Sequence, residues 1–161
     1  MDLQVIDNFL GDYQFKQLES TFLGNDFPWY YNDDVVREQD SSNNYQFTHI
    51  FYDPKLGVIS DAYEMMQGCL DKLKVKKLMR IKANLRPRPL FHRSGCYHID
   101  TENVTTAILY LNTNNGWTRF KKGGKVKSVA NRLVKFDSNL EHQGVTCTDE
   151  KRRVVINFNY E

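Results

Sequence analysis

His98 and Asp100, two positions apart, bear side chains that bind transition metals, an imidazole and a carboxylate. Side chains two apart in an extended strand point to the same face, so a strand over residues 96–100 would direct both ligands to one side. A second imidazole, from His142 on a neighbouring strand, would complete two nitrogens and one carboxylate. This arrangement is the facial triad of non-haem Fe(II), which leaves positions open for a cosubstrate and dioxygen.

The His-x-Asp pair is weak evidence by itself. The chain has 4 His, and composition alone yields such a pair roughly once in three sequences of this kind. The alternative is a histidine at a strand end followed by an aspartate in a turn. The rest of the sequence therefore has to distinguish between a metal site and this alternative.

Length and composition predict one soluble domain. The chain has 161 residues with 40% hydrophobic and 13% aromatic content, which suits a single domain over residues 1–161 with a sizeable core. It has no apolar run near the ~20 residues of a membrane span and does not open with a signal peptide. Cys69, Cys96 and Cys147 are odd in number and lack CxxC spacing, which favours reduced thiols. We therefore expect a cytoplasmic protein with no membrane partner.

Charge is unevenly distributed, although the net charge is only +2. Residues 1–71 contain 3 Lys/Arg and 13 Asp/Glu, whereas residues 72–161 contain 19 and 7. The milder interpretation is an acidic layer packed beside a basic sheet. The alternative is a basic mouth that steers an anionic substrate. The candidates for steering are the hairpin lysines Lys121, Lys122, Lys125 and Lys127.

The periodicity changes from helical to strand-like near residue 76. Apolar residues at helical spacing predict helices over 12–23 and 58–73, and residues 27–31 form an aromatic loop. Short segments of strand character between turn signals predict the strands 3–6, 45–52, 78–85, 96–100, 105–112, 117–120, 126–129, 132–137 and 154–160. The expected class is α+β: a helical layer over about 1–75 flanks a β core over about 76–161, of sandwich or barrel type.

Arg152 and Arg153 open the last predicted strand, so their side chains point to opposite faces and one of them points inward. A buried guanidinium requires an anion, and a carboxylate matches its planar fork. The far carboxylate of a dicarboxylate ligand would satisfy it. The sequence does not decide which arginine has this role.

Together these residues resemble the Fe(II)/2-oxoglutarate-dependent oxygenases, in particular the prolyl-hydroxylase-like branch and its small phage and marine-bacterial members. The resemblance covers about half of the chain, from Arg80 to Tyr160. It implies a double-stranded β-helix, also called a jelly roll or cupin-like fold. It also implies that His98, Asp100 and His142 bind Fe(II).

The same resemblance implies 2-oxoglutarate as cosubstrate, with Arg153 and Tyr110 at its distal carboxylate, and O2 as the second cosubstrate. Arg152 stays an alternative anchor, because the spacing from His142 is slightly long. The implied reaction is hydroxylation with release of succinate and CO2. Halogenating members of the family replace the metal-binding carboxylate, whereas Asp100 is present here.

The sequence does not identify the primary substrate. A peptide, including a prolyl peptide, a small molecule and a nucleic acid remain open as partners, and the loops 33–44 and 85–95 carry no decodable signature. His92 either lines the entrance or lies in a surface loop. Two other classes are retained: a non-catalytic cupin-like module that binds a metal or sugar, and a nucleic-acid-binding protein.

Overall fold

A computed structural model describes residues 3–33 and 44–161 of the chain. Over these residues it contains the helices α1 (Asp12–Phe22) and α2 (Gln67–Leu73) and the 3-10 helix η1 (Asp61–Met66). The strands are β1 (Gln4–Ile6), β2 (Tyr30–Asn32), β3 (Gln46–Asp53), β4 (Gly57–Val58), β5 (Leu78–Pro87), β6 (Thr105–Tyr110), β7 (Trp117–Phe120), β8 (Lys125–Lys127), β9 (Arg132–Asp137), β10 (His142–Val145) and β11 (Arg152–Tyr160).

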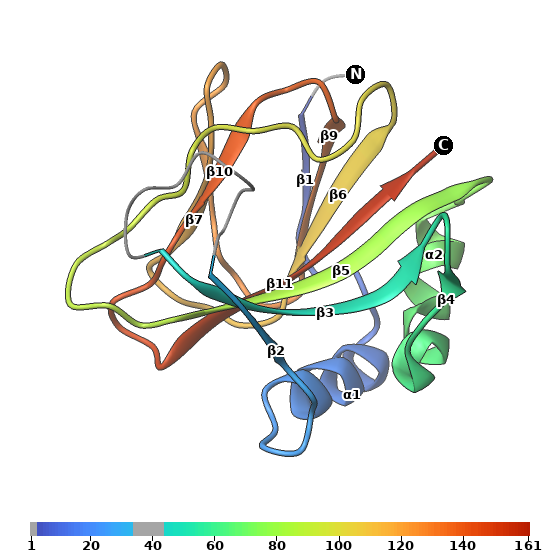
Figure 1. Ribbon diagram of the computed structural model, residues 1–161, viewed down its shortest axis with the longest axis horizontal. Helices are drawn as coiled ribbons and strands as arrows, with labels where there is room; N and C mark the ends of the chain where they lie inside the picture. Colours follow the sequence, from blue (N-terminus) through green and yellow to red (C-terminus); the bar gives the residue numbers. More distant parts are fainter. Residues whose placement is uncertain (1–2, 34–43) are drawn as a thin grey trace.

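The strands form two antiparallel sheets. The large sheet has the order β1-β9-β6-β11-β5-β3-β2, with β4 paired to β3, and the small sheet has the order β10-β7-β8. Figure 1 shows α1 and α2 on one side of the large sheet and the strands β7 and β10 on the other. The expected jelly roll, a double-stranded β-helix flanked by helices from the N-terminal half, is confirmed.

Side-chain alternation gives the central strands of the large sheet two different faces. On β11, Val154, Ile156 and Phe158 are buried in the main core. Phe15 and Phe22 of α1 are buried in the same core, so the apolar face of the helix covers this side of the sheet.

The opposite face of the large sheet looks toward the small sheet. A second, smaller core lies there, and includes Ile108, Phe120, Val126 and Phe136. Asn157 of β11 projects from the same face as Val155, because the two residues are two positions apart. The space between the sheets is therefore partly core and partly a polar cavity.

Several predicted elements differ in the structure. The predicted helix 58–73 is divided into β4, η1 and α2, because Ser60 is extended (φ −113°, ψ 136°) and its Oγ accepts a hydrogen bond from the Ala62 N–H. The aromatic loop is partly a strand, since β2 pairs with β3. The strand predicted over 96–100 is wrong, because only His98 makes a bridge there.

The helical layer expected over residues 1–75 also contains the strands β1 to β4. Residues 34–43, most of the loop 33–44 for which no function could be read, lie outside the described residues. Among the described helices, none combines the length and the apolar character needed to cross a bilayer.

Candidate functional site

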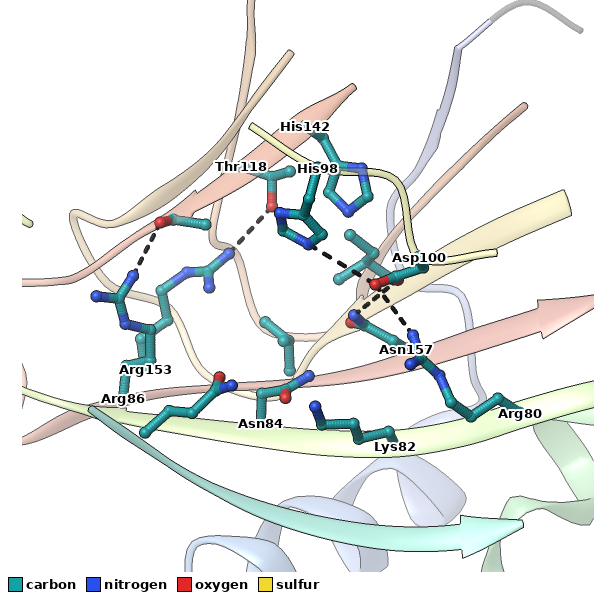
Figure 2. A pocket seen from close by; sticks show the side chains of 14 residues that line it. Arg80, Lys82, Asn84, Arg86, His98, Asp100, Thr118, His142, Arg153 and Asn157 are labelled. Atoms are coloured by element: carbon teal, nitrogen blue, oxygen red, sulfur yellow. Dashed lines mark hydrogen bonds and ion pairs between the residues drawn. The ribbon is translucent and has the colours of Figure 1, made fainter. Parts of the chain in front are cut away.

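The three predicted metal ligands lie together between the two sheets. Their donor atoms, one from each of His98, Asp100 and His142, are all within 4.8 Å of one another. His142 is the first residue of β10, and His98 lies in the segment between β5 and β6. The two histidine backbones form an isolated antiparallel bridge. Figure 2 shows both imidazoles directed toward the Asp100 carboxylate.

Backbone carbonyls select the tautomer of both imidazoles. Nδ1 of His98 lies 3.1 Å from the Cys96 carbonyl oxygen, and Nδ1 of His142 lies 3.3 Å from that of Leu140. A carbonyl only accepts hydrogen bonds, so each Nδ1 carries the proton and donates it. Each Nε2 therefore keeps its lone pair for a metal, and the second nitrogen orients the ring.

Asp100 is held as an anion. One carboxylate oxygen lies 3.0 Å from an Arg80 nitrogen, and the other accepts a hydrogen bond from Asn157 Nδ2 at 3.4 Å. Burial acts to raise the pKa of Asp100, but the Arg80 charge and the two histidines outweigh it and lower the pKa to about 2. Burial also lowers the pKa of His142. At neutral pH the site therefore offers a carboxylate and a neutral imidazole, the forms that bind metals.

This donor set fits a divalent first-row metal. Imidazole nitrogens and a carboxylate are suitable ligands for iron, and three protein ligands on one side leave the remaining positions open. The fit rests on the ligand identities, the free Nε2 atoms and the short separations of the donor atoms.

A cavity of about 70 Å³ adjoins the three ligands. Its floor comes from alternate residues of β5, which share one face of the strand. The lining residues outside the triad are Gln46, Arg80, Lys82, Asn84, Arg86, Ile108, Thr118, Gly144, Arg153, Val155 and Asn157. Figure 2 shows Asn84 and Lys82 beside one another on this floor, with Arg153 at the end remote from Arg80.

Of the two neighbouring arginines Arg152 and Arg153, Arg153 lines the cavity. It is 3% exposed, its Nε donates to Ser128 Oγ at 2.8 Å, and its Nη2 donates to Thr118 Oγ1 at 3.1 Å. Burial lowers the pKa of Arg153, although a guanidinium stays protonated in proteins. Within the described residues, no carboxylate lies in ion-pair range of it. Arg152 instead donates to the carbonyl of Leu23, next to α1.

Tyr110 lies behind Thr118, which separates it from the cavity. It is fully buried, and its hydroxyl donates to Thr118 Oγ1 at 2.8 Å. The Arg153 guanidinium carbon lies 5.5 Å from the centre of its ring. Thr118, not Tyr110, lines the cavity. A direct contact of Tyr110 with a cosubstrate therefore requires a different arrangement from the one observed.

The remaining histidines lie outside the triad. His49 is buried, with Nδ1 2.9 Å from the Pro28 carbonyl oxygen and Nε2 2.6 Å from Ser60 Oγ. His92 is exposed, and its ring packs 4.8 Å from that of Trp117. These positions agree with a structural role for His49 and a surface position for His92. The three cysteines are free thiols.

Sequence reasoning did not assign three residues of this site. Arg80 was named only as the first residue of the family resemblance, and Thr118 and Asn157 received no role. A signal for Arg80 was present, because Arg80, Lys82 and Asn84 alternate along the predicted strand 78–85 and so share a face. Nothing in the sequence showed that this face would meet Asp100.

Comparisons with known proteins identify the fold. The sequence matches no protein family and no curated protein. It is similar in structure to a prolyl-4-hydroxylase from Pseudomonas putida (TM-score 0.70, 18% identity, 99% of this chain and 92% of that chain). An oxidoreductase of the 2OG-Fe(II) oxygenase family from Burkholderia pseudomallei is also similar (TM-score 0.74, 8% identity, 99% and 84% covered).

The chain has the fold of these oxygenases. A third similar structure is a prolyl hydroxylase from Trichoplax adhaerens, in complex with a hypoxia inducible factor oxygen degradation domain peptide fragment (TM-score 0.65, 17% identity, 98% and 82% covered). The likeness extends over nearly the whole chain, including α1 and β1 to β4, and so reaches beyond the half in which the sequence resemblance was found.

Proposed function

We propose that this chain is an Fe(II)- and 2-oxoglutarate-dependent dioxygenase. The observation that carries the proposal is one cavity that joins the His98, Asp100 and His142 cluster to the buried guanidinium of Arg153. A module that only binds a metal would not explain why the Arg153 cation is buried in the same cavity without a described carboxylate partner. A cosubstrate with two carboxylates accounts for both ends of the cavity.

Three residues would bind the metal, and two others orient one of these ligands. Nε2 of His98, Nε2 of His142 and the Asp100 carboxylate would hold Fe(II). Arg80 and Asn157 fix the orientation of that carboxylate. In such a site Fe(II) supplies oxidative decarboxylation of 2-oxoglutarate to succinate and CO2, coupled to hydroxylation of a substrate.

The distal carboxylate of 2-oxoglutarate would bind at Arg153 and Thr118. Oγ1 of Thr118 already accepts hydrogen bonds from Tyr110 and Arg153. A hydroxyl has two lone pairs and one proton. Because both lone pairs of Thr118 Oγ1 accept hydrogen bonds, its proton is left to donate, and Thr118 lines the cavity. The threonine would thus donate to the carboxylate, while Tyr110 holds the threonine in place.

We favour a protein or peptide as the substrate, with a prolyl residue as one possible site of hydroxylation. A small molecule is the alternative substrate. Support comes from the peptide bound by the Trichoplax prolyl hydroxylase. Retention of Asp100 as a metal ligand favours hydroxylation. We also infer that residues 1–161 act as one domain, because the strands from the first 75 residues extend the same large sheet.

The decisive experiment is an anaerobic titration with Fe(II) and then 2-oxoglutarate, followed by succinate release in air with panels of peptides and nucleotides. We expect 2-oxoglutarate to bind only to the metal-loaded protein, and Asp100→Ala to abolish both steps. Metal binding without 2-oxoglutarate binding would favour the non-catalytic module. Steeply salt-dependent binding of nucleic acid without any need for metal would favour the nucleic-acid-binding class.

A further inference from the structure

The outer face of the small sheet is basic. Thr118 and Val126 are buried toward the large sheet, so their neighbours Arg119, Lys125 and Lys127 point the opposite way, away from the cavity. All three are exposed. We call them the basic face. Because these side chains point away from the cavity, steering of a substrate into its mouth does not explain them.

The charges of the basic face are not balanced locally. Arg119 lies directly opposite Lys125 in the β7–β8 register, and like charges in that position are unfavourable. Lys121, in the adjoining turn, pairs with Glu141 at 2.6 Å, but none of the described carboxylates pairs with the basic face. Lysines on an edge strand such as β8 discourage aggregation, yet Arg119 is on the central strand β7.

Two apolar side chains project beside this face. Leu90 is 92% exposed and Phe91 is 80% exposed. We call them the apolar tip. They follow Pro87 and Pro89, whose rings fix the backbone φ angles and stiffen the segment. Arg88, which is also exposed, lies between the prolines. Single exposed apolar residues are common, but an adjacent pair beside cations points to a binding surface.

Side-chain contacts of His92 hold the segment that carries the apolar tip against the small sheet. His92, next to Phe91, places its ring 4.8 Å from that of Trp117, and its Nδ1 lies 2.6 Å from the Thr146 carbonyl oxygen. Lys125 Nζ lies 4.7 Å from the centre of the same Trp117 ring. In Figure 1 the yellow-green segment after β5 passes on the side of the molecule where β7 and β10 lie. The segment that carries the tip thus borders the basic face at Trp117.

We propose that this surface docks on an anionic lipid bilayer. Leu90 and Phe91 would enter the boundary between headgroups and acyl chains, while Arg88, Arg119, Lys125 and Lys127 contact anionic headgroups. Peripheral proteins bind membranes through this combination of buried apolar area and electrostatic attraction. It needs no spanning segment, and the absence of such a segment was the reason for expecting no membrane partner.

A single-stranded nucleic acid fits the surface less well. Such strands bind where bases stack on aromatic rings beside cations. Trp117 already contacts His92 and Lys125, and Leu90 has no planar face to offer. An exposed leucine beside an exposed phenylalanine suits acyl chains better than bases.

Co-sedimentation with vesicles tests the proposal. The vesicles contain phosphatidylcholine alone or with about one third phosphatidylglycerol, at low and high salt, and a single-stranded oligothymidylate is titrated in parallel. We expect binding only to the anionic vesicles. Arg119→Gln with Lys125→Gln should weaken it roughly tenfold or more, and Leu90→Ser with Phe91→Ser by a similar factor.

Matched controls separate this surface from general charge and hydrophobicity. Lys55→Gln with Lys76→Gln removes two exposed lysines elsewhere, and Leu56→Ser removes an exposed leucine, 75% exposed, elsewhere. Both should bind vesicles as the unchanged protein does. Equal binding to neutral vesicles, no loss in the Leu90 and Phe91 variant, or tighter binding to the oligonucleotide than to anionic vesicles would each overturn the proposal. The test needs neither metal nor 2-oxoglutarate, so its outcome is independent of the proposed enzymatic activity.

Discussion

The backbones of His98 and His142 hold each other in place. The N–H of each residue donates to the carbonyl of the other at 3.0 Å, so one antiparallel bridge sets the separation of the two imidazoles that we propose as metal ligands. The ring centres lie 4.7 Å apart. Because main-chain atoms make this bridge, the spacing of the ligands does not depend on the imidazoles themselves.

Replacing the ligands should therefore abolish metal binding and leave the fold intact. His98→Ala, Asp100→Ala and His142→Ala should each weaken Mn(II) affinity by more than the ~10–100-fold typical of residues outside the ligand set. Calorimetry gives the affinity, and circular dichroism gives the fold. His49→Ala is the control: it loses two hydrogen bonds, to Pro28 and Ser60, but should bind Mn(II) normally. Normal affinity in any ligand variant would remove that residue from the triad.

Arg153→Lys should weaken 2-oxoglutarate binding although the charge is kept. An ammonium cannot reproduce the planar fork that now reaches Ser128 and Thr118. We expect a loss of roughly 10–100-fold in the Mn(II)-loaded protein, the range for one or two charged hydrogen bonds. Arg152→Lys should leave this affinity unchanged, because Arg152 contacts Leu23 beside α1. The opposite order of effects would transfer the role to Arg152.

Tyr110 should act on the cosubstrate through Thr118. Thr118→Val removes the hydroxyl at the cavity wall and should weaken 2-oxoglutarate binding roughly tenfold, and Tyr110→Phe should have a smaller effect. The double variant should bind no worse than Thr118→Val alone, because residues acting in series are not additive. Additive losses would instead indicate a direct contact of Tyr110 with the cosubstrate.

Arg80→Met should destabilise the metal-free protein by roughly 1–3 kcal/mol, because it leaves the buried Asp100 without its charged hydrogen-bond donor. Mn(II) should then raise the melting temperature of this variant more than that of the unchanged protein, because the metal restores a cationic partner to a buried carboxylate that has lost Arg80. Lys82→Met, on the same face of β5, is the matched control. Equal metal-induced shifts in Arg80→Met and the unchanged protein would show that the Arg80 charge does not stabilise the Asp100 carboxylate in the metal-free protein.

The ion pair between Asp7 and Arg132 should give a pH-dependent contribution to stability. Arg132 donates from Nε at 2.6 Å and from Nη2 at 2.9 Å, and this hydrogen bonding lowers the pKa of Asp7. A depressed pKa stabilises the fold above the unfolded value of about 3.9, and this contribution is lost as pH falls through the folded pKa.

Asp7→Asn should therefore lower the melting temperature at pH 7, and the difference from the unchanged protein should shrink as the pH falls below about 3.9. Thermal scans across this range measure it. Asp26→Asn, at an exposed position, serves as control and should show no such dependence. A constant difference at all pH values would mean that the effect of Asp7→Asn is not electrostatic.

Local patterns identified much of the fold. The strand-like segments 105–112 and 132–137 predicted β6 and β9, and both strands formed, because short segments rich in apolar residues are typical of strands that are buried in a sheet. The helix over 58–73 failed because Ser60 is a helix cap. A serine in an apolar stretch can cap a helix or lie within one, and only the path of the neighbouring chain decides.

The segment around His98 shows the limit of strand reasoning at the site. The argument that His98 and Asp100 share a face assumed a regular strand, whereas the structure has one bridge at His98. The donor atoms still converge, because the partner of that bridge is the third ligand. The ligands could thus be named from their types and order, although the geometry that unites them was not the one assumed.

The sequence by itself determined the residue types of the proposed metal site, the alternation that points one of two neighbouring arginines inward, and the succession of short strands that forms a jelly roll. Only the tertiary structure decided that the inward residue is Arg153, that Thr118 stands between Tyr110 and the cavity, and that Arg80 meets Asp100. The physical reason is that these relations join strands distant in sequence. Register between such strands is set by packing and hydrogen bonding across the whole sheet, and a shift of one residue would exchange every inward side chain for an outward one.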